Sequence, residues 1–258
     1  MFIKSFICSF VISLFLSLSV YGDDFAAGAR AYEKSDYKTD VKIWKILATQ
    51  GNVVAQYNLG VMYDLGYGVP VDKKEAIKWF RLAAEQGDVL SQYYIGSMYE
   101  FGIGIQKDKK EAARWYRLAA EQGDEDAQFH LGNLYYMGEG IAKDDKEAVR
   151  LYDQSARQGN KYAMNGLARM LRDGKGIEED NIYAYMWFNL ADEAGHSSAK
   201  EKREELSEKM TTKELRIAQE LSQKCLDSDY KKCESALPNF LHRKFNLSTE
   251  DKDYEDKD

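Results

Sequence analysis

Residues 53–88 read VVAQYNLGVMYDLGYGVPVDKKEAIKWFRLAAEQGD, and residues 89–124 read VLSQYYIGSMYEFGIGIQKDKKEAARWYRLAAEQGD. Residues 125–160 and 161–196 continue the same frame with more substitutions. Four columns keep their residue in every copy: Gly66, Gly102, Gly138 and Gly174; Gly68, Gly104, Gly140 and Gly176; Ala76, Ala112, Ala148 and Ala184; and Gly87, Gly123, Gly159 and Gly195. A fixed period of this length predicts a stack of similar structural units.

Each copy carries the signals of a helix, a turn and a second helix. In the first copy Ala55, Leu59 and Met62 fall on one helical face, and Gly66 then ends the helix. Asp72 is placed to cap the second helix, and the residue three positions later, Glu75, should reach back to complete a capping box. The same pair recurs as Asp108 with Glu111 and as Asp144 with Glu147, whereas Asp180 is followed by Tyr183 and should start its helix less firmly.

Glycines also recur inside the first helix of the copies, at Gly60, Gly96 and Gly132, with Ala168 in the fourth. A glycine in a helix interior costs roughly 1 kcal/mol relative to alanine. Its recurrence therefore predicts a helix crossing too close for a methyl group. The fold class that follows is all-α, built from stacked helix-turn-helix repeats.

These residues carry a family resemblance. The pattern A-Q-Y-N-L-G-x-x-Y-x-x-G-x-G-V, followed by D-x-x-x-A-x-x-W-F-x-x-A-A-x-x-G, resembles the Sel-one-like (Sel1) repeat, a relative of the tetratricopeptide repeat. The resemblance covers about residues 24–226 and implies a right-handed α-solenoid, a superhelix of helix pairs. Residues 23–52 are similar to a shorter, degenerate first repeat, in which Asp40 replaces alanine and should lie on a wet outer face.

The ends of the chain differ from the repeats. After His196 we expect capping helices over about Ser197–Leu206 and Thr212–Lys224, within a C-terminal segment of residues 197–240. The last residues, 241–258, end in the acidic run EDKDYEDKD and are expected to be disordered.

The first 22 residues have the pattern of an export signal. One cation, Lys4, precedes an apolar run from Phe6 to Val20 that is too short to span a bilayer with ease. Small residues at Val20 and Gly22 predict a cut near Gly22. The mature protein would then be periplasmic or secreted, without stable membrane insertion; an uncleaved membrane anchor is the alternative.

Charge and cysteine usage narrow the partners. The formal net charge is −7, and loss of residues 1–22 would make it −8, which argues against a nucleic-acid partner. Cys8 would leave with the signal. An exported chain would keep Cys225 and Cys233 in an oxidising compartment, where we expect one disulfide.

Candidate catalytic residues are sparse, and we expect none, with no metal and no cofactor. The histidines are His130, His196 and His242, and they form no ligand set. Ser-x-x-Lys pairs, which penicillin-recognising enzymes use, occur at Ser35/Lys38, Ser197/Lys200 and Ser228/Lys231 without their partner motifs. The Gly-x-Gly turns lack the setting of a phosphate site.

Stacked helix pairs leave the first helices of successive repeats on one concave face. By analogy with tetratricopeptide grooves, a protein or peptide partner should contact Tyr57, Val61, Asp64, Tyr93, Ser97, Glu100, Phe129, Asn133, Tyr136, Asn165, Arg169 and Arg172. Alternatively, Tyr57, Tyr93 and Phe129, which are one repeat apart, fill the seams between repeats.

Two functions remain open at this stage. The first is an exported scaffold or adaptor that binds a partner protein or peptide. The second is a cell-envelope enzyme or binder of β-lactam or peptidoglycan type, which the resemblance implies because some cysteine-rich exported relatives bind or hydrolyse β-lactams. Those relatives staple each repeat with a cysteine pair, and residues 23–224 contain no cysteine.

Overall fold

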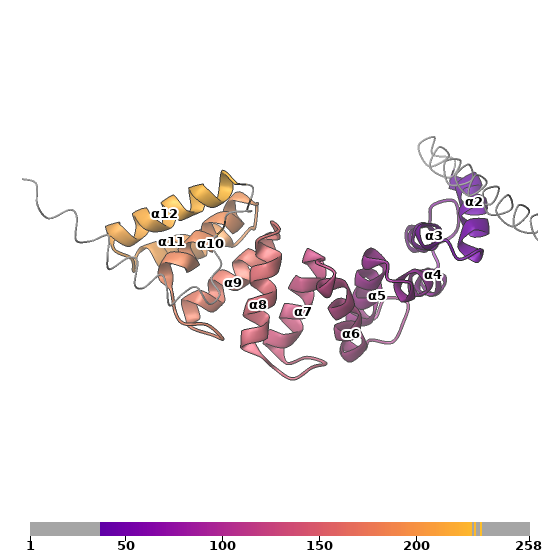
Figure 1. Cartoon of the computed structure of the whole chain (residues 1–258), viewed down its shortest axis with the longest axis horizontal. Coiled ribbons are helices and arrows are strands. Elements are labelled where there is room, and N and C mark those ends of the chain that lie inside the picture. Colours follow the sequence, from indigo (N-terminus) through magenta and orange to yellow (C-terminus); the bar gives the residue numbers. More distant parts are fainter. Residues whose placement is uncertain (1–36, 229, 231–232, 234–258) are drawn as a thin grey trace, which may run out of the picture. The chain divides into compact units, whose positions relative to one another are not determined.

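The computed structural model describes residues 37–228 together with residues 230 and 233 (Figure 1). This part of the chain contains eleven α-helices and no strand. The predicted signal peptide (1–22), residues 23–36 of the degenerate repeat, residues 234–240 and the predicted acidic tail (241–258) lie outside the described residues.

Successive helices form pairs, as the repeats predict. Their bounds are α2 Tyr37–Thr49, α3 Val53–Leu65, α4 Lys73–Glu85, α5 Val89–Phe101, α6 Lys109–Glu121, α7 Glu125–Met137, α8 Asp145–Ala156, α9 Lys161–Asp173, α10 Asn181–Glu193, α11 Ala199–Ser207 and α12 Thr212–Leu226. Each of the four sequence copies holds two helices, so the predicted all-α stack of helix-turn-helix repeats is confirmed. The chain divides into two compact units, one ending at Leu118 and the other beginning at Ala119.

The predicted helix ends are present, with one correction. Gly66 takes a left-handed conformation (φ 82°) and donates its N–H to Met62 O, while Asp72 accepts from the N–H groups of Lys74 and Glu75. The predictions that Glu75, Glu111 and Glu147 close capping boxes are wrong. The N–H of Asp72 already donates to Tyr63 O at 2.9 Å, and Glu75 instead accepts from Lys78 Nζ at 2.6 Å. The N–H groups of Asp108 and Asp144 donate to Tyr99 O and Tyr135 O, while Glu111 and Glu147 accept from Arg114 and Arg150.

Close helix crossing explains the glycines inside the first helices. A methyl group added at Gly60 would lie 2.7 Å from Phe80 Cδ1, and one added at Gly96 would lie 2.7 Å from Tyr116 Cδ1. At Gly132 the same methyl would lie 2.9 Å from Tyr152 Cε1. An aromatic ring of the second helix thus occupies the space that a side chain would need.

A buried glutamine column, which the sequence reasoning did not use, fastens consecutive repeats. The Nε2 atoms of Gln56, Gln92 and Gln128 donate to the carbonyls of Ala48, Ala84 and Ala120, near the end of the preceding second helix. Each amide is at most 4% exposed. Because a buried polar group needs a partner, this column helps to fix how each repeat meets the one before it.

In the first unit, α2 packs on α3, and α3 packs on α4. Trp44, Leu47 and Leu59 form the core between them. Asp40, predicted to lie on a wet outer face, is instead fully buried (0% exposed). That prediction was wrong because Asp40 occupies the inward-facing position that the apolar residues of α2 share.

The second unit ends in helices that cover α10. Helix α10 lies beside α9, α11 and α12 and packs against them (Figure 1). Trp187 and Phe188 on α10 are completely buried. Thr211 and Glu214 form the reciprocal capping box at the start of α12. Cys225 and Cys233 form a disulfide with a Cα–Cα distance of 4.6 Å, as predicted.

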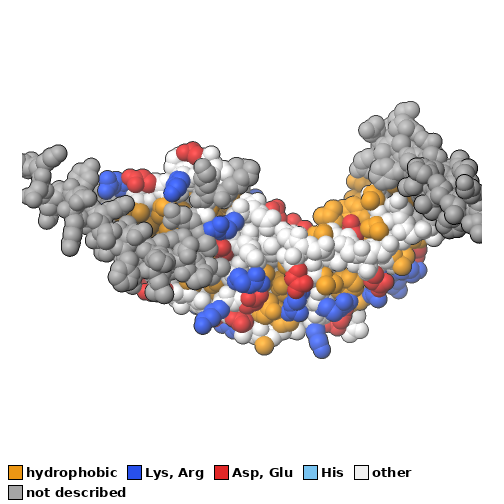
Figure 2. All heavy atoms as spheres, viewed as in Figure 1, with side chains coloured by type: hydrophobic (Ala, Val, Ile, Leu, Met, Phe, Trp, Pro, Cys, Tyr) orange, Lys and Arg blue, Asp and Glu red, His pale blue; other side chains and the backbone are white. Residues whose placement is uncertain are grey.

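Charged side chains of both signs are interspersed with apolar ones on the face that Figure 2 shows. Among the described helices, none is both long and apolar enough to cross a membrane.

Candidate functional site

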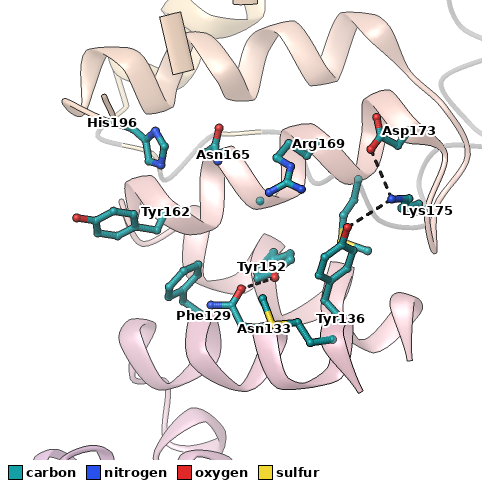
Figure 3. Close-up of a pocket in the computed structure, with 13 residues that line it drawn as sticks. Phe129, Asn133, Tyr136, Tyr152, Tyr162, Asn165, Arg169, Asp173, Lys175 and His196 are labelled. Carbon is teal, nitrogen blue, oxygen red and sulfur yellow. Dashed lines mark hydrogen bonds and ion pairs between the residues drawn. The ribbon is translucent and has the colours of Figure 1, made fainter. Parts of the chain in front are cut away.

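A pocket of about 140 Å³ lies in the second unit between α7 and α9 (Figure 3). We call it the α7–α9 pocket. Its walls come from the first helices of two successive repeats, with one ring from α8 and residues from the turns after α9 and α10. Its lining comprises Phe129, Asn133, Tyr136, Met137, Tyr152, Tyr162, Asn165, Gly166, Arg169, Met170, Asp173, Lys175 and His196.

Helical spacing creates two facing rows. Phe129, Asn133 and Tyr136 are four and three residues apart and share one side of α7. Asn165 and Arg169 are four residues apart on α9 and lie opposite this row (Figure 3). The pocket is therefore a direct product of stacking two first helices side by side.

One end of the pocket is aromatic. The ring centroids of Phe129 and Tyr162 are 5.8 Å apart, and those of Tyr162 and His196 are 5.5 Å apart. Tyr162 is 52% exposed and Met137, at the other end of the α7 row, is 60% exposed. Such partly exposed aromatic and methionine side chains are typical of protein interfaces.

Hydrogen bonds orient Asn133, Asn165 and Tyr136 of the lining. Tyr152 Oη donates to Asn133 Oδ1 at 2.6 Å. Lys202 Nζ, from α11, donates to Asn165 Oδ1 at 3.3 Å. Lys175 Nζ donates to Tyr136 Oη at 3.4 Å.

Positive charge dominates the pocket. A hydrogen bond from Arg172, at 2.8 Å, lowers the pKa of Asp173, and Lys175 Nζ lies 3.8 Å from the same carboxylate. Burial, then the charges of Arg169 and Arg172, lower the pKa of Lys202. Several cations thus surround one carboxylate, Asp173, whose negative charge they balance.

The pKa of His196 lies below its ordinary value. Burial, followed by the charge of Lys202, lowers the pKa of His196. Its ring therefore serves as part of the aromatic wall rather than as a further cation.

The Sel1 repeat model matches residues 53–88, 89–124, 125–160 and 161–196, which is more than half of the chain. The chain belongs to the Sel1 repeat family. A search of curated protein sequences gave no match. Sel1 repeat proteins generally mediate protein–protein interactions.

Solved structures include several Sel1 repeat proteins. The Sel1 repeat protein from Oxalobacter formigenes is 32% identical, covers 69% of this chain and 73% of its own, and has a TM-score of 0.65. A protective antigen of uropathogenic Escherichia coli is 23% identical, with 83% and 63% covered and a TM-score of 0.47. The cysteine rich protein B of Helicobacter pylori is 22% identical, with 52% and 97% covered and a TM-score of 0.41.

The pocket brings together five of the partner-binding residues predicted from the sequence. They are Phe129, Asn133, Tyr136, Asn165 and Arg169. Arg172 does not line the pocket. Its guanidinium pairs with Asp173 and lies 6.0 Å from the centre of the Phe188 ring.

The other predicted residues belong to the Sel1 repeats of the first unit. The ring of Tyr57 lies 5.9 Å from that of Phe80 and 6.0 Å from that of Tyr94, and burial raises the pKa of Tyr57 to about 12. The ring of Tyr93 lies 5.9 Å from that of Tyr116. Both tyrosines are therefore half-buried against neighbouring rings, as the seam-filling alternative expects.

The polar candidates of the first unit are engaged locally. Asp64 pairs with Lys73 Nζ at 2.8 Å. Glu100 accepts from Tyr116 Oη at 2.7 Å, and Ser97 also hydrogen-bonds to Tyr116. Val61 is half-buried and packs against the core of this unit.

Sequence reasoning missed several lining residues. Tyr162 occupies the column of Val54, Leu90 and Asp126, so no repeating residue type marks it. Lys175 sits between the two glycines of its turn, and His196 occupies the column of helix caps. The available signal was the departure of one repeat from the pattern of the others.

The described residues contain neither a cluster of metal ligands nor a buried Ser-x-x-Lys pair. Within them, no group of three or more His, Cys, Asp or Glu side chains could hold a metal ion. Ser197 and Lys200 are the one Ser-x-x-Lys pair that is wholly described, and both are exposed.

Proposed function

We propose that this Sel1 repeat chain is an exported adaptor that binds a segment of a partner protein on the face formed by the first helices of its repeats. The α7–α9 pocket is the principal contact. The observation that carries the proposal is the gathering of the exposed side chains of Tyr162 and Arg169, the half-buried Asn133 and the buried Asn165 around one opening between two successive first helices.

The chemistry of the lining suits a peptide better than a small reacting substrate. Tyr162 and Met137 offer exposed apolar surface, and Asn133 and Asn165 offer amides that can bond to a peptide backbone. Aromatic and arginine side chains at the centre of an interface contribute most of its binding energy. In Figure 3 the Arg169 side chain extends from α9 toward the α7 row.

Export is supported by the N-terminal sequence. Residues 1–22 combine one lysine, an apolar run and small residues before Asp23. The proposed partner therefore lies in the periplasm or outside the cell.

Site-specific photo-crosslinking tests the proposal. A photoreactive phenylalanine at Tyr162 places the probe at the pocket mouth, and one at Gln154 places it on the exposed surface of α8 as a control. In the native cells, the probe at Tyr162 should give a discrete crosslinked product whose peptides mass spectrometry assigns to one protein. Identical products from both positions would contradict the proposal.

A substitution provides the quantitative arm. Tyr162→Ala should weaken capture of that protein about tenfold or more, because it removes an exposed aromatic contact. Leu82→Ala, which truncates a similarly exposed side chain on a second helix, should leave capture unchanged. Circular dichroism should show both variants folded.

A further inference from the structure

Hydrogen-bond donors remain available in the α7–α9 pocket. Asn133 Oδ1 is occupied by Tyr152, and Asn165 Oδ1 is occupied by Lys202. Each amide therefore has its Nδ2 group left over, and in the described part of the chain nothing accepts from it. Tyr136 Oη accepts from Lys175, so its own proton is also free to be donated.

Arg169 adds the strongest donor. Its side chain is exposed, and among the described residues it forms neither a hydrogen bond nor an ion pair. The one acid of the lining, Asp173, is already paired with Arg172 and Lys175. The five N–H donors of Arg169 thus form no direct bond to Asp173, the carboxylate of the lining, which Arg172 and Lys175 already contact.

This cation is peculiar to one repeat. The column of Arg169 holds Val61, Ser97 and Asn133 in the earlier repeats, and the neighbouring column of Arg172 holds Asp64, Glu100 and Tyr136. The chain as a whole is acidic, with a formal net charge of −7. The pocket therefore carries positive side chains in a protein whose net charge is negative.

We infer that the α7–α9 pocket is a carboxylate-specific site that takes an aspartate or glutamate side chain from an acidic segment of the partner protein. The carboxylate would accept hydrogen bonds from Arg169 and from the Asn133 and Asn165 amides. The bond from Arg169 would be the strongest of these, because both of its partners are charged. This inference rests on the proposed function and specifies the partner's chemistry.

The aromatic end of the pocket supplies the second element of recognition. Phe129 and Tyr162 form an apolar wall beside the donors. The matching segment carries an aromatic residue flanked by acids.

Three peptides that carry a neutral BODIPY label at the N-terminus and an amidated C-terminus test the inference on the full chain: GDEFDEG, its uncharged counterpart GNQFNQG, and the basic GKKFKKG. Fluorescence anisotropy should show binding of GDEFDEG and at least tenfold weaker binding of the other two, because only carboxylates satisfy the cationic donors. Equal affinity for GDEFDEG and GNQFNQG would overturn the inference, as would no binding of GDEFDEG at millimolar concentration.

A matched pair of variants distinguishes binding in the pocket from attraction to the net charge of the whole protein. Arg169→Gln should weaken GDEFDEG about tenfold or more and leave GNQFNQG unchanged. Arg216→Gln removes the same charge from an exposed position on α12 and should leave both unchanged. Equal losses from the two variants would contradict a specific site.

The chain's own acidic segment is the competing occupant. A full-length variant in which every acid of residues 250–258 is replaced by its amide should bind GDEFDEG as the parent chain does. Tighter binding by tenfold or more would assign the pocket to that segment and overturn the partner assignment.

Failure of this inference and failure of the proposed function give different results. If Tyr162→Ala abolishes capture of the crosslinked protein and Arg169→Gln does not change it, the pocket binds a partner but is not carboxylate-specific. If neither variant alters capture, the proposed function itself fails.

Discussion

Gly96→Ala tests the close helix crossing on which the repeat stack depends. The added methyl group would lie 2.7 Å from Tyr116 Cδ1 and 2.8 Å from Cε1, well inside the optimal carbon–carbon separation of about 3.5–4.0 Å. Tyr116 is fully buried, and its hydroxyl donates to Glu100 at 2.7 Å. The ring therefore has no free space into which it can move.

Gly96→Ala changes the free energy of unfolding through two opposing contributions, helix propensity and core packing. Alanine is favoured over glycine in a helix interior by about 1 kcal/mol. Overpacking a core costs about 1–3 kcal/mol. A hydrogen bond to a charged group contributes about 1.5–3 kcal/mol, and part of this is lost when the Tyr116–Glu100 bond is weakened. We expect Gly96→Ala to lower the free energy of unfolding by about 2 kcal/mol.

Urea unfolding followed by far-UV circular dichroism measures this change. Gly166→Ala is the matched control, because its methyl group would lie 3.3 Å from the nearest atom of Tyr152, and it should be close to neutral. In a Tyr116→Leu background the cost of Gly96→Ala should disappear. A Gly96→Ala protein as stable as the parent would refute the role assigned to this crossing.

Three further predictions follow from single contacts. Asp72→Ala removes both capping bonds of α4 and should cost about 1 kcal/mol in urea unfolding. Because burial and then Lys202 lower the pKa of His196 below its usual 6.5, its contribution to stability is present above that pH and lost as pH falls. His196→Gln should therefore flatten the loss of stability between about pH 7 and pH 5, and an unchanged slope would count against this. Cys225→Ser should cost about 2–3 kcal/mol and abolish the response of the unfolding midpoint to reductant.

Most of the fold could be predicted because every repeat carries the same local signals. Gly66 permits the left-handed end of α3, and Asp72 caps α4, so both helix ends follow from residue type. Gly96 predicted a close crossing because its cost in a helix needs a reason. Glu75 failed as a capping-box partner because a backbone carbonyl from the preceding helix had taken the N–H, and no local pattern shows that.

The site was only partly predictable. Helical spacing placed Phe129 and Asn133 on one face and Arg169 on the next, and the pocket unites them. It could not show that Arg172 turns toward Phe188, because that depends on how the side chains of α10 pack against α9. Nor could it show that Lys202 orients Asn165, since this contact joins residues far apart in sequence.

Helices α7 and α9, the first helices of two successive repeats, present a donor-lined pocket that we propose binds a partner. Nuclear magnetic resonance of the 15N-labelled chain tests it directly through the side-chain amide signals of Asn133 and Asn165 during titration with GDEFDEG. We expect these two signals to shift together, and to stay unmoved with GNQFNQG. Shifts confined to amides outside the pocket, such as that of Gln154 on α8, would contradict the account.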